Sequence, residues 1–141
     1  MNYVEMTAPC GRDCFNCAMY LARDNAQIRE SLAKKFNVEP SVVTCEGCRN
    51  VEGKCRLMPH LGMSSQCSNY ECARAKGVQF CGDCPDFPCE KLHPMADKAS
   101  FLPHNLKVYN LCRIRTLGVE KWAETEAGQS CKTYFEGKLN F

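Results

Sequence analysis

Apolar positions recur at helical spacing along the chain, and the longest such stretch is residues 17–36. One face of a helix drawn over these residues carries Leu21, Ile28, Leu32 and Phe36. Glu30 and Lys34 form a favourable i,i+4 pair on the same stretch. Pro40 cannot continue a helix and disfavours helical backbone at the residue before it. We therefore expect one helix over 17–36 that ends in the segment "NVEP".

Three shorter helices are expected further along. They cover 69–77, closed by Gly77, then 105–118, and 119–128, which carries the single tryptophan, Trp122. In 105–118 the apolar stripe consists of Leu106, Tyr109 and Ile114. The segment "VQFCGDCPDFPC" contains two prolines and a turn, so we expect it to be irregular. No stretch alternates apolar and polar residues as a strand does, and the pattern predicts a mainly α fold with irregular loops.

The cysteines divide the chain into two parts. Eleven of the thirteen lie between Cys10 and Cys89, and only Cys112 and Cys131 follow. At 141 residues the chain fits one small domain. We expect a single domain over 1–141, with a cysteine-rich metal-binding part at 1–92 and a helical part at 93–141.

The cysteine content raises the choice between disulfides and metal. Thirteen cysteines in 141 residues is a density typical of secreted disulfide scaffolds. The start "MNYVEMTAPC" has neither the basic nor the apolar region of a signal peptide, and the count is odd. No stretch reaches the roughly 20 apolar residues of a membrane span. We expect a cytoplasmic protein whose reduced cysteines bind metal.

Charge gives little support for nucleic acid as a partner. The formal net charge is +2, and the basic residues are scattered among acidic ones with no basic run. If the protein has a partner, the sequence favours another protein, and it gives no indication of a membrane.

The cysteine spacings favour metal sites. They read C-x3-C-x2-C at 10, 14 and 17, C-x2-C at 45 and 48, C-x4-C at 67 and 72, and C-x2-C-x4-C at 81, 84 and 89. Two residues between cysteines allow a tight turn to direct both sulfurs at one ion, and "CEGC" and "CGDC" each have a glycine there. Redox dithiols are disfavoured because no thioredoxin-like βαβ pattern surrounds these pairs.

The triplet "CGRDCFNC" has the spacing by which radical enzymes hold three corners of an iron–sulfur cluster. Such enzymes need a partial β/α barrel of about 200 residues or more. This chain has 141 residues and no alternation of strands and helices, which excludes that class.

The choice between zinc and an iron–sulfur cluster stays open at this point. Zinc favours C-x2-C pairs joined by longer loops, as at 45/48 and 81/84. A closely spaced triplet and the "CP" at 84–85 are typical of clusters. Zinc (Zn2+) is the favoured ion, and a 4Fe-4S cluster with an electron-transfer or redox-sensing role is the alternative.

Several further residues have two interpretations. Cys55, His60 and His93 lie near the cysteine pairs and could complete a site or have no part in one. Cys112 is expected to be a small buried side chain and Cys131 a free surface thiol. The arginines within two residues of a cysteine could neutralise thiolates or lie in solvent; they are Arg12, Arg49, Arg56 and Arg74.

Catalysis is disfavoured. A catalytic zinc keeps one position open and generally has histidine or carboxylate ligands, whereas all-thiolate sites are usually closed. The sequence shows no carboxylate–histidine arrangement of that kind. We therefore expect a non-catalytic protein with structural zinc in one or more all-cysteine sites, although the sequence does not exclude an enzyme.

The motifs resemble those of domain-of-unknown-function family 3795, whose members are small cysteine-rich proteins described as zinc-binding. The matching segments are "CGRDCFNC", "CEGC", "CSNYECARAKG", "CGDCPDFPC" and "LGVEKW", which span roughly residues 8 to 125. A further C-x2-C that follows the tryptophan in many members is missing here, because Cys131 is followed by "KTY".

The resemblance implies a set of ten metal ligands. They are Cys10, Cys14, Cys17, Cys45, Cys48, Cys67, Cys72, Cys81, Cys84 and Cys89. Sequence proximity suggests that the triplet at 10–17 shares an ion with a later thiol such as Cys89. It also suggests that Cys45 and Cys48 join Cys67 and Cys72.

Overall fold

The computed structural model describes residues 2–92 and 106–136 of the chain. The helices are α1 (Ala18–Leu21), α2 (Ala26–Phe36), α3 (Ser68–Ala75), α4 (Leu106–Leu117), α5 (Val119–Trp122) and α6 (Gly128–Glu136). Short 3-10 turns lie at Cys14–Asn16, Pro40–Val43, Met58–Leu61, Cys81–Asp83 and Glu90–Leu92, and one π-turn at Ala123–Ala127. Extended pairing in the described ranges is limited to isolated bridges at Thr7–Asp13 and Lys54–Gln66. The predicted mainly α fold is confirmed.

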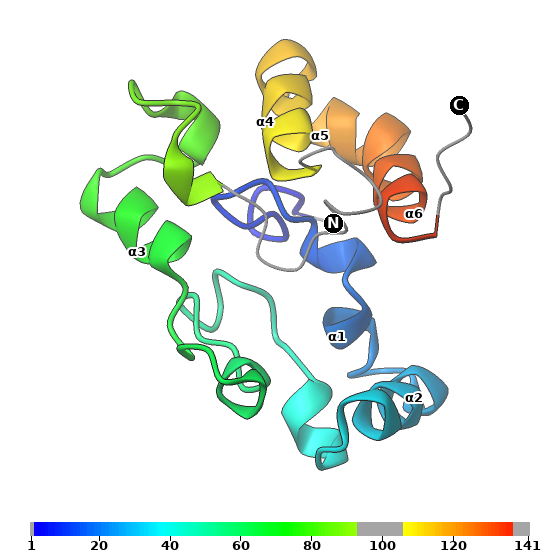
Figure 1. Cartoon of the computed structure of the whole chain (residues 1–141). Coiled ribbons are helices and arrows are strands. Elements are labelled where there is room, and N and C mark those ends of the chain that lie inside the picture. The colour runs from blue at the N-terminus through cyan, green and yellow to red at the C-terminus, as the bar shows by residue number, and fades with distance from the viewer. Residues whose placement is uncertain (1, 93–105, 137–141) are drawn as a thin grey trace, which may run out of the picture.

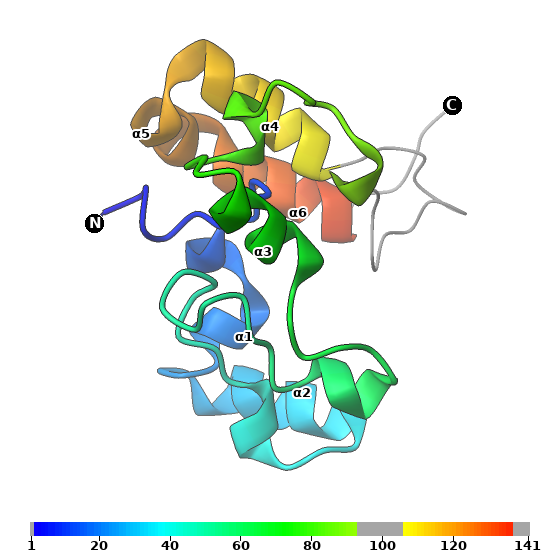
Figure 2. The same cartoon turned by 90° about the vertical axis from the view of Figure 1, so that its left-hand side faces the viewer.

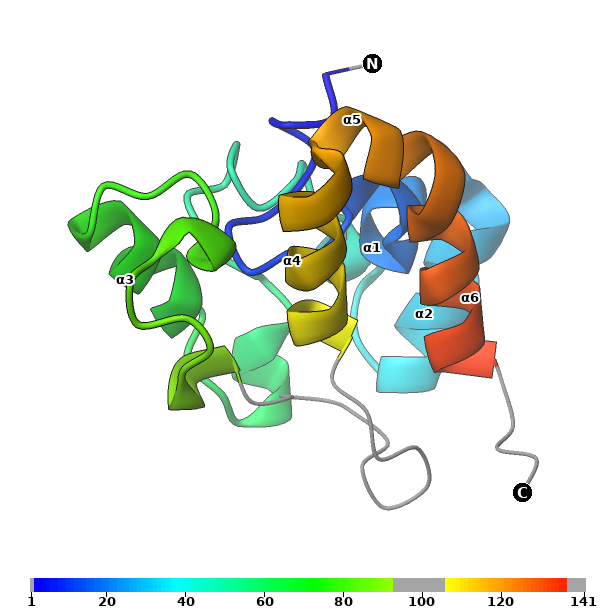
Figure 3. The same cartoon turned by 90° about the horizontal axis from the view of Figure 1, so that it is seen from above.

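The helices of the two halves lie at opposite ends of the molecule. Figure 1 shows α4, α5 and α6 at one end and α1 and α2 at the other, with the N-terminal segment between them. The side view in Figure 2 shows the same separation. Seen from above, α3 and α6 lie on either side of α4 (Figure 3). The N-terminal segment, which carries the first three cysteines, is therefore central.

Two separate hydrophobic cores accompany this arrangement. The larger joins the N-terminal segment to the C-terminal helices and contains Ala8, Cys10, Phe80, Leu92, Leu111, Ile114, Val119, Trp122, Ala123 and Ala127. Phe15 packs edge-on against Trp122, with ring centroids 6.3 Å apart. The smaller core is formed by Ala33, Val43 and Leu57 beside α2. A core of three buried residues provides little hydrophobic stabilisation to the end of the molecule that contains α1 and α2.

Gly11 explains how the first cysteine motif fits against α4. Its φ is +83°, and a Cβ there would lie 3.0 Å from Leu111 Cγ and 3.2 Å from the Lys107 carbonyl oxygen. The buried Asn110 side chain donates a hydrogen bond from Nδ2 to the Gly11 carbonyl oxygen at 2.9 Å. The glycine of "CGRDC" therefore allows the loop to contact α4 directly, and this contact positions Cys10 and Cys14 on either side of it.

The expected single helix over 17–36 is wrong, because the chain breaks between α1 and α2. Asn25 adopts extended backbone, and its side chain accepts a hydrogen bond from the Ile28 N–H at 3.1 Å, which caps α2. Arg29 Nη1 donates to the carbonyl oxygens of Ala22 and Arg23 at 2.9 and 3.0 Å. The carbonyl oxygens at the break between the two helices are therefore paired with the Arg29 side chain. Leu21 consequently leaves the apolar face and is 41% exposed.

Helix ends at glycine were predicted with mixed success. Gly77 and Gly118 follow α3 and α4 with positive φ, as expected. Gly128 does not end a helix: its φ is −61°, and the chain continues from α5 through the π-turn into α6. In α4 the expected stripe is wrong at Tyr109, which is 49% exposed, while Leu111 is fully buried.

None of the helices in the described part of the chain combines the length and apolar character that crossing a membrane requires. His93, one of the residues that could complete a metal site, lies outside the described residues.

Candidate metal centres

All thirteen cysteines are unpaired thiols, and their exposure varies from buried at Cys10 and Cys14 to exposed at Cys112. Across residues 2–92 and 106–136, no three His, Cys, Asp or Glu side chains converge in the arrangement of an ion site. Two groups of four cysteines nevertheless lie near one another, without converging on one point.

The N-terminal cluster consists of Cys14, Cys17, Cys45 and Cys48. The Cys48 backbone N–H donates to Cys14 Sγ at 3.3 Å, so the two motifs meet although they lie 34 residues apart. The pKa of Cys45 is raised by burial, and the neighbouring thiols of Cys17 and Cys14 add to the effect. The first motif thus supplies two thiols and "CEGC" the other two.

Within this cluster the Cys14 thiol has a lowered pKa. A hydrogen bond from the Cys48 thiol, together with the one from its backbone N–H, lowers the pKa of Cys14 to about 7 despite burial. The same pairing raises the pKa of Cys48, and burial raises it further. A thiolate that accepts two hydrogen bonds is a prepared metal ligand, because its charge is already partly offset.

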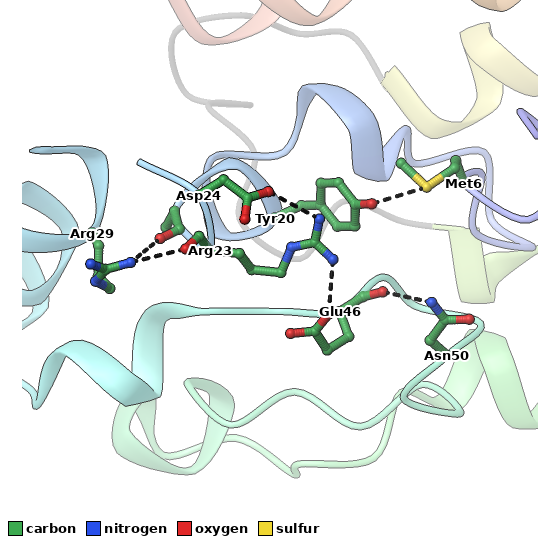
Figure 4. A network of polar contacts seen from close by, with 8 residues as sticks. Met6, Tyr20, Arg23, Asp24, Arg29, Glu46 and Asn50 are labelled. Atoms are coloured by element: carbon green, nitrogen blue, oxygen red, sulfur yellow. Dashed lines mark hydrogen bonds and ion pairs between the residues drawn. The ribbon is translucent and has the colours of Figure 1, made fainter. Parts of the chain in front are cut away.

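A polar network covers the "CEGC" turn (Figure 4). The Arg23 guanidinium lies 3.7 Å from the centroid of the Tyr20 ring and pairs with Glu46 Oε2 at 2.8 Å. The Tyr20 hydroxyl contacts Met6 Sδ at 3.2 Å, and Asn50 Nδ2 donates to the Glu46 carbonyl oxygen at 2.9 Å. The residue between Cys45 and Gly47 is therefore fixed to α1 and its following turn.

Arg49 fastens three separate segments beside the cluster. Its Nε donates to the carbonyl oxygens of Val4 and Thr7 at 3.1 and 2.9 Å, and its Nη2 donates to that of Gln79 at 2.8 Å. Its guanidinium also lies over the Phe80 ring, 5.3 Å from the ring centroid. The two roles considered for Arg49 were neutralising thiolates and lying in solvent. The observed role is neither of these, because the side chain binds backbone carbonyls.

The other arginines near cysteines differ among themselves. Burial opposes the charge of Arg12, but the neighbouring Cys17 and Asp13 outweigh it and raise the pKa of the guanidinium. Arg12 therefore fits the neutralising role. Arg56 and Arg74 are exposed, as expected for solvated side chains.

The cavity cluster consists of Cys72, Cys81, Cys84 and Cys89. These four thiols line one cavity of about 530 Å³ between α3 and the loop that follows it. Burial raises the pKa of Cys81 to about 12, and the charges of Cys10, Cys89, Cys72 and Cys84 contribute in that order. Cys81 is held in place by its N–H, which donates to the Pro9 carbonyl oxygen at 2.7 Å.

Two lysines face the thiols of the cavity cluster. Lys91 Nζ lies 3.4 Å from Cys72 Sγ, and Lys76 Nζ lies 3.6 Å from Cys84 Sγ. Lys76 also pairs with Asp86. Lys76 follows Cys72 by four residues, so helical spacing alone could have placed it on the same side of α3. The position of Lys91 depends on a loop and had no comparable signal.

Cys10 and Cys67 belong to neither cluster. Cys10 is buried in the larger core, and this burial raises the pKa of its thiol, with a smaller contribution from Cys67. The Cys67 N–H donates to the Gly53 carbonyl oxygen at 3.0 Å at the start of α3. Cys10 also raises the pKa of Cys48 and of Cys81, so it lies near a thiol of each cluster.

The remaining candidates fall outside the clusters. Cys55 packs against the smaller core, and His60 is exposed. Cys112 is exposed rather than buried, so that prediction is wrong. Cys131 is half-buried, with Sγ 3.9 Å from the Asn16 carbonyl oxygen, and burial raises the pKa of its thiol to about 11. It is therefore not the free surface thiol that was expected.

The arrangement of the clusters also differs from the grouping suggested by sequence proximity. Cys45 and Cys48 lie near Cys14 and Cys17, a neighbourhood that the proximity grouping did not include. Cys89 shares the cavity with Cys72, not with the triplet.

The fold and the two thiol clusters define a small, mainly α, cysteine-rich protein. A family model described as a protein of unknown function, DUF3795, matches residues 6–94, and the chain belongs to this family. The matched range contains all ten candidate ligands, whereas the "LGVEKW" segment lies outside it. No curated protein and no solved structure matches the chain.

Proposed function

We propose that this is a non-catalytic metal-binding protein whose structural zinc is held by two sets of four cysteines. The observation that carries the proposal is that thiols from segments far apart in sequence adjoin one another in two groups. The N-terminal cluster comprises Cys14, Cys17, Cys45 and Cys48, and the cavity cluster comprises Cys72, Cys81, Cys84 and Cys89.

The donor sets fit zinc. Four thiolates without histidine or carboxylate are the ligands of closed structural zinc sites. The N–H of Cys48 on Cys14 Sγ is the kind of backbone hydrogen bond that offsets charge on a ligand sulfur. When bound, zinc supplies a cross-link between segments. Such a cross-link suits this chain, since the core beside α2 in the described residues has three buried side chains, with partly buried ones packed against them.

The same donor chemistry supports a non-catalytic role. A site closed by four thiolates offers no position for a substrate or an activated water. We propose the cytoplasm as the compartment, because clustered cysteines stay reduced there and are free to bind metal. A partner, if there is one, is proposed to be another protein.

Metal removal tests the structural role. We expect the zinc-loaded full chain to lose helical circular dichroism and its cooperative thermal transition when a chelator is added with reductant, because metal binding and folding are coupled in such sites. A variant with Cys112→Ser, outside both clusters, should behave like the parent protein. Unchanged helical signal and an unchanged transition after complete metal removal would disprove the structural role.

A further inference from the structure

The two clusters differ in how they are closed. In the N-terminal cluster Cys14 is only 4% exposed and Gly47 is buried. A Cβ at Gly47 would lie 3.7 Å from the Tyr20 ring and 3.9 Å from Cys14 Sγ, so the ring covers this turn. The Arg23–Glu46 pair holds the same turn against α1 (Figure 4). A competing ligand would reach the Cys14 thiol only after local opening of the fold, whereas Cys17, Cys45 and Cys48 are half-buried.

The cavity cluster lies open at its rim. Its cysteines are half-buried around a cavity of about 530 Å³, and the loop residues beside them, among them Pro85, Asp86 and Pro88, are exposed. The two lysines that contact the thiols are themselves exposed. A small ligand from solvent can therefore approach these thiols without disturbing either hydrophobic core.

A buried amide provides an independent sign of a ligand in this cavity. Asn69 lines it from α3 and is 5% exposed, yet its Nδ2 has no hydrogen-bond partner among the described residues. A buried donor without a hydrogen-bond partner destabilises the fold. A metal-bound thiolate sulfur in the cavity would accept this hydrogen bond.

We propose that the cavity cluster is an exchangeable site that takes up and hands over a zinc ion, whereas the N-terminal cluster retains its ion. This inference rests on the proposed function and adds a transfer role to it. In the exchange each bond from zinc to a cysteine of the cavity is replaced by a bond to a thiolate of the acceptor, with no change of oxidation state. The freed thiolates of Cys72 and Cys84 then face Lys91 and Lys76, whose ammonium groups offset their charge.

Competition with a coloured zinc chelator on the zinc-loaded full chain tests the proposal. We expect two equivalents to leave in two phases that differ in rate by about tenfold or more. Pulse alkylation and mass spectrometry on the same sample identify the thiols freed in each phase without any substitution. Cys72, Cys84 and Cys89 should be labelled in the fast phase, and Cys14, Cys45 and Cys48 in the slow one. Cys112, exposed and outside both clusters, should be labelled throughout.

Matched variants complete the test. Cys84→Ser should remove the fast phase and keep the slow one, while Cys45→Ser should affect the slow one. If two equivalents leave together, or the N-terminal thiols are freed first, the exchange role is overturned and zinc binding stands. A single retained equivalent also overturns it. A protein that binds no zinc overturns the proposed function as well.

Discussion

Among the glycines of the described residues, Gly53 leaves the least room for a side chain. Its φ is +76°, and a Cβ there would lie 2.6 Å from both Cβ and Cγ of Tyr70 on α3. We expect Gly53→Ala to lower the free energy of unfolding by about 2–4 kcal/mol, from overpacking and backbone strain together. Urea unfolding of the metal-loaded protein measures this loss.

Gly62→Ala is the matched control for that substitution. Gly62 has nearly the same φ, +74°, but no atom lies within 4 Å of a Cβ built there. We expect only the strain contribution, about 1 kcal/mol. Equal losses in the two variants would mean that the loop carrying Gly53 does not pack against Tyr70.

Cys131 and Cys112 should differ in reactivity. Because burial raises the pKa of Cys131 to about 11, we expect its alkylation by iodoacetamide to be slow at pH 8 and to accelerate as the pH rises toward that value. Cys112 is exposed and serves as the reference within the same protein. Mass spectrometry of zinc-loaded protein gives both rates. Faster labelling of Cys131 than of Cys112 at pH 8 would contradict the described burial.

These two cysteines also show what local sequence can predict. Cys112 was expected to be buried because Leu111 is its neighbour, but on α4 the inward positions are Leu106, Asn110, Leu111 and Ile114. Cys131 acquires its burial from the Asn16 segment, 115 residues earlier in the chain. Such long-range contacts leave no signal in a single sequence.

At the scale of elements, the chain continues from α5 through the π-turn into α6. This continuity predicts that replacing a glycine raises stability instead of lowering it. Gly128 has ordinary helical backbone, and the atoms nearest a Cβ there, Asn16 Nδ2 and Oδ1, lie at 3.9 and 4.0 Å. We expect Gly128→Ala to raise the free energy of unfolding by about 0.5–1 kcal/mol, because alanine is the better helix former. Thermal unfolding of both proteins measures the difference.

Gly118→Ala is the matched control for Gly128→Ala. Gly118 has a φ of +82° in open space at the end of α4, so the same substitution there should lower stability. If Gly128→Ala also lowered it, the helix would end near residue 128, as the sequence pattern had predicted.

Arg49 links three segments of the chain that lie far apart in sequence. Lysine cannot reproduce its three hydrogen bonds to the carbonyl oxygens of Val4, Thr7 and Gln79. We expect Arg49→Lys to lower the free energy of unfolding by about 2 kcal/mol. The exposed Arg74 provides the control, since Arg74→Lys should change stability by less than about 0.5 kcal/mol. Equal losses of stability in the two variants would show that the hydrogen bonds of the Arg49 guanidinium contribute little to stability.

The positions at which a helix breaks were harder to predict from the sequence than the presence of the helices. The apolar spacing of 17–36 is compatible with one helix, and only the cap formed by Asn25 and the two hydrogen bonds of Arg29 divide it. Asparagine is tolerated inside helices, so its presence does not force a break. Gly77 and Gly118, in contrast, were predicted correctly because each follows a complete apolar pattern and adopts positive φ.

At the scale of the whole molecule, the sequence predicted a mainly α protein with clustered thiols, and it did not predict which thiols meet. Spacing within a motif shows that two sulfurs can face one ion. Which motifs share a site depends on how loops pack, as when the Cys48 N–H reaches Cys14 Sγ across 34 residues. The grouping of Cys45 and Cys48 by sequence proximity therefore missed their contact with the Cys14 segment.

The central claim is that two four-cysteine clusters each hold one zinc ion, and metal analysis tests it most directly. Inductively coupled plasma mass spectrometry of anaerobically purified full chain, with a visible spectrum of the same sample, is the measurement. We expect two equivalents of zinc and no visible absorbance. Protein that contains no metal, or iron with labile sulfide and a brown band near about 400 nm from a thiolate-ligated cluster, would contradict the account.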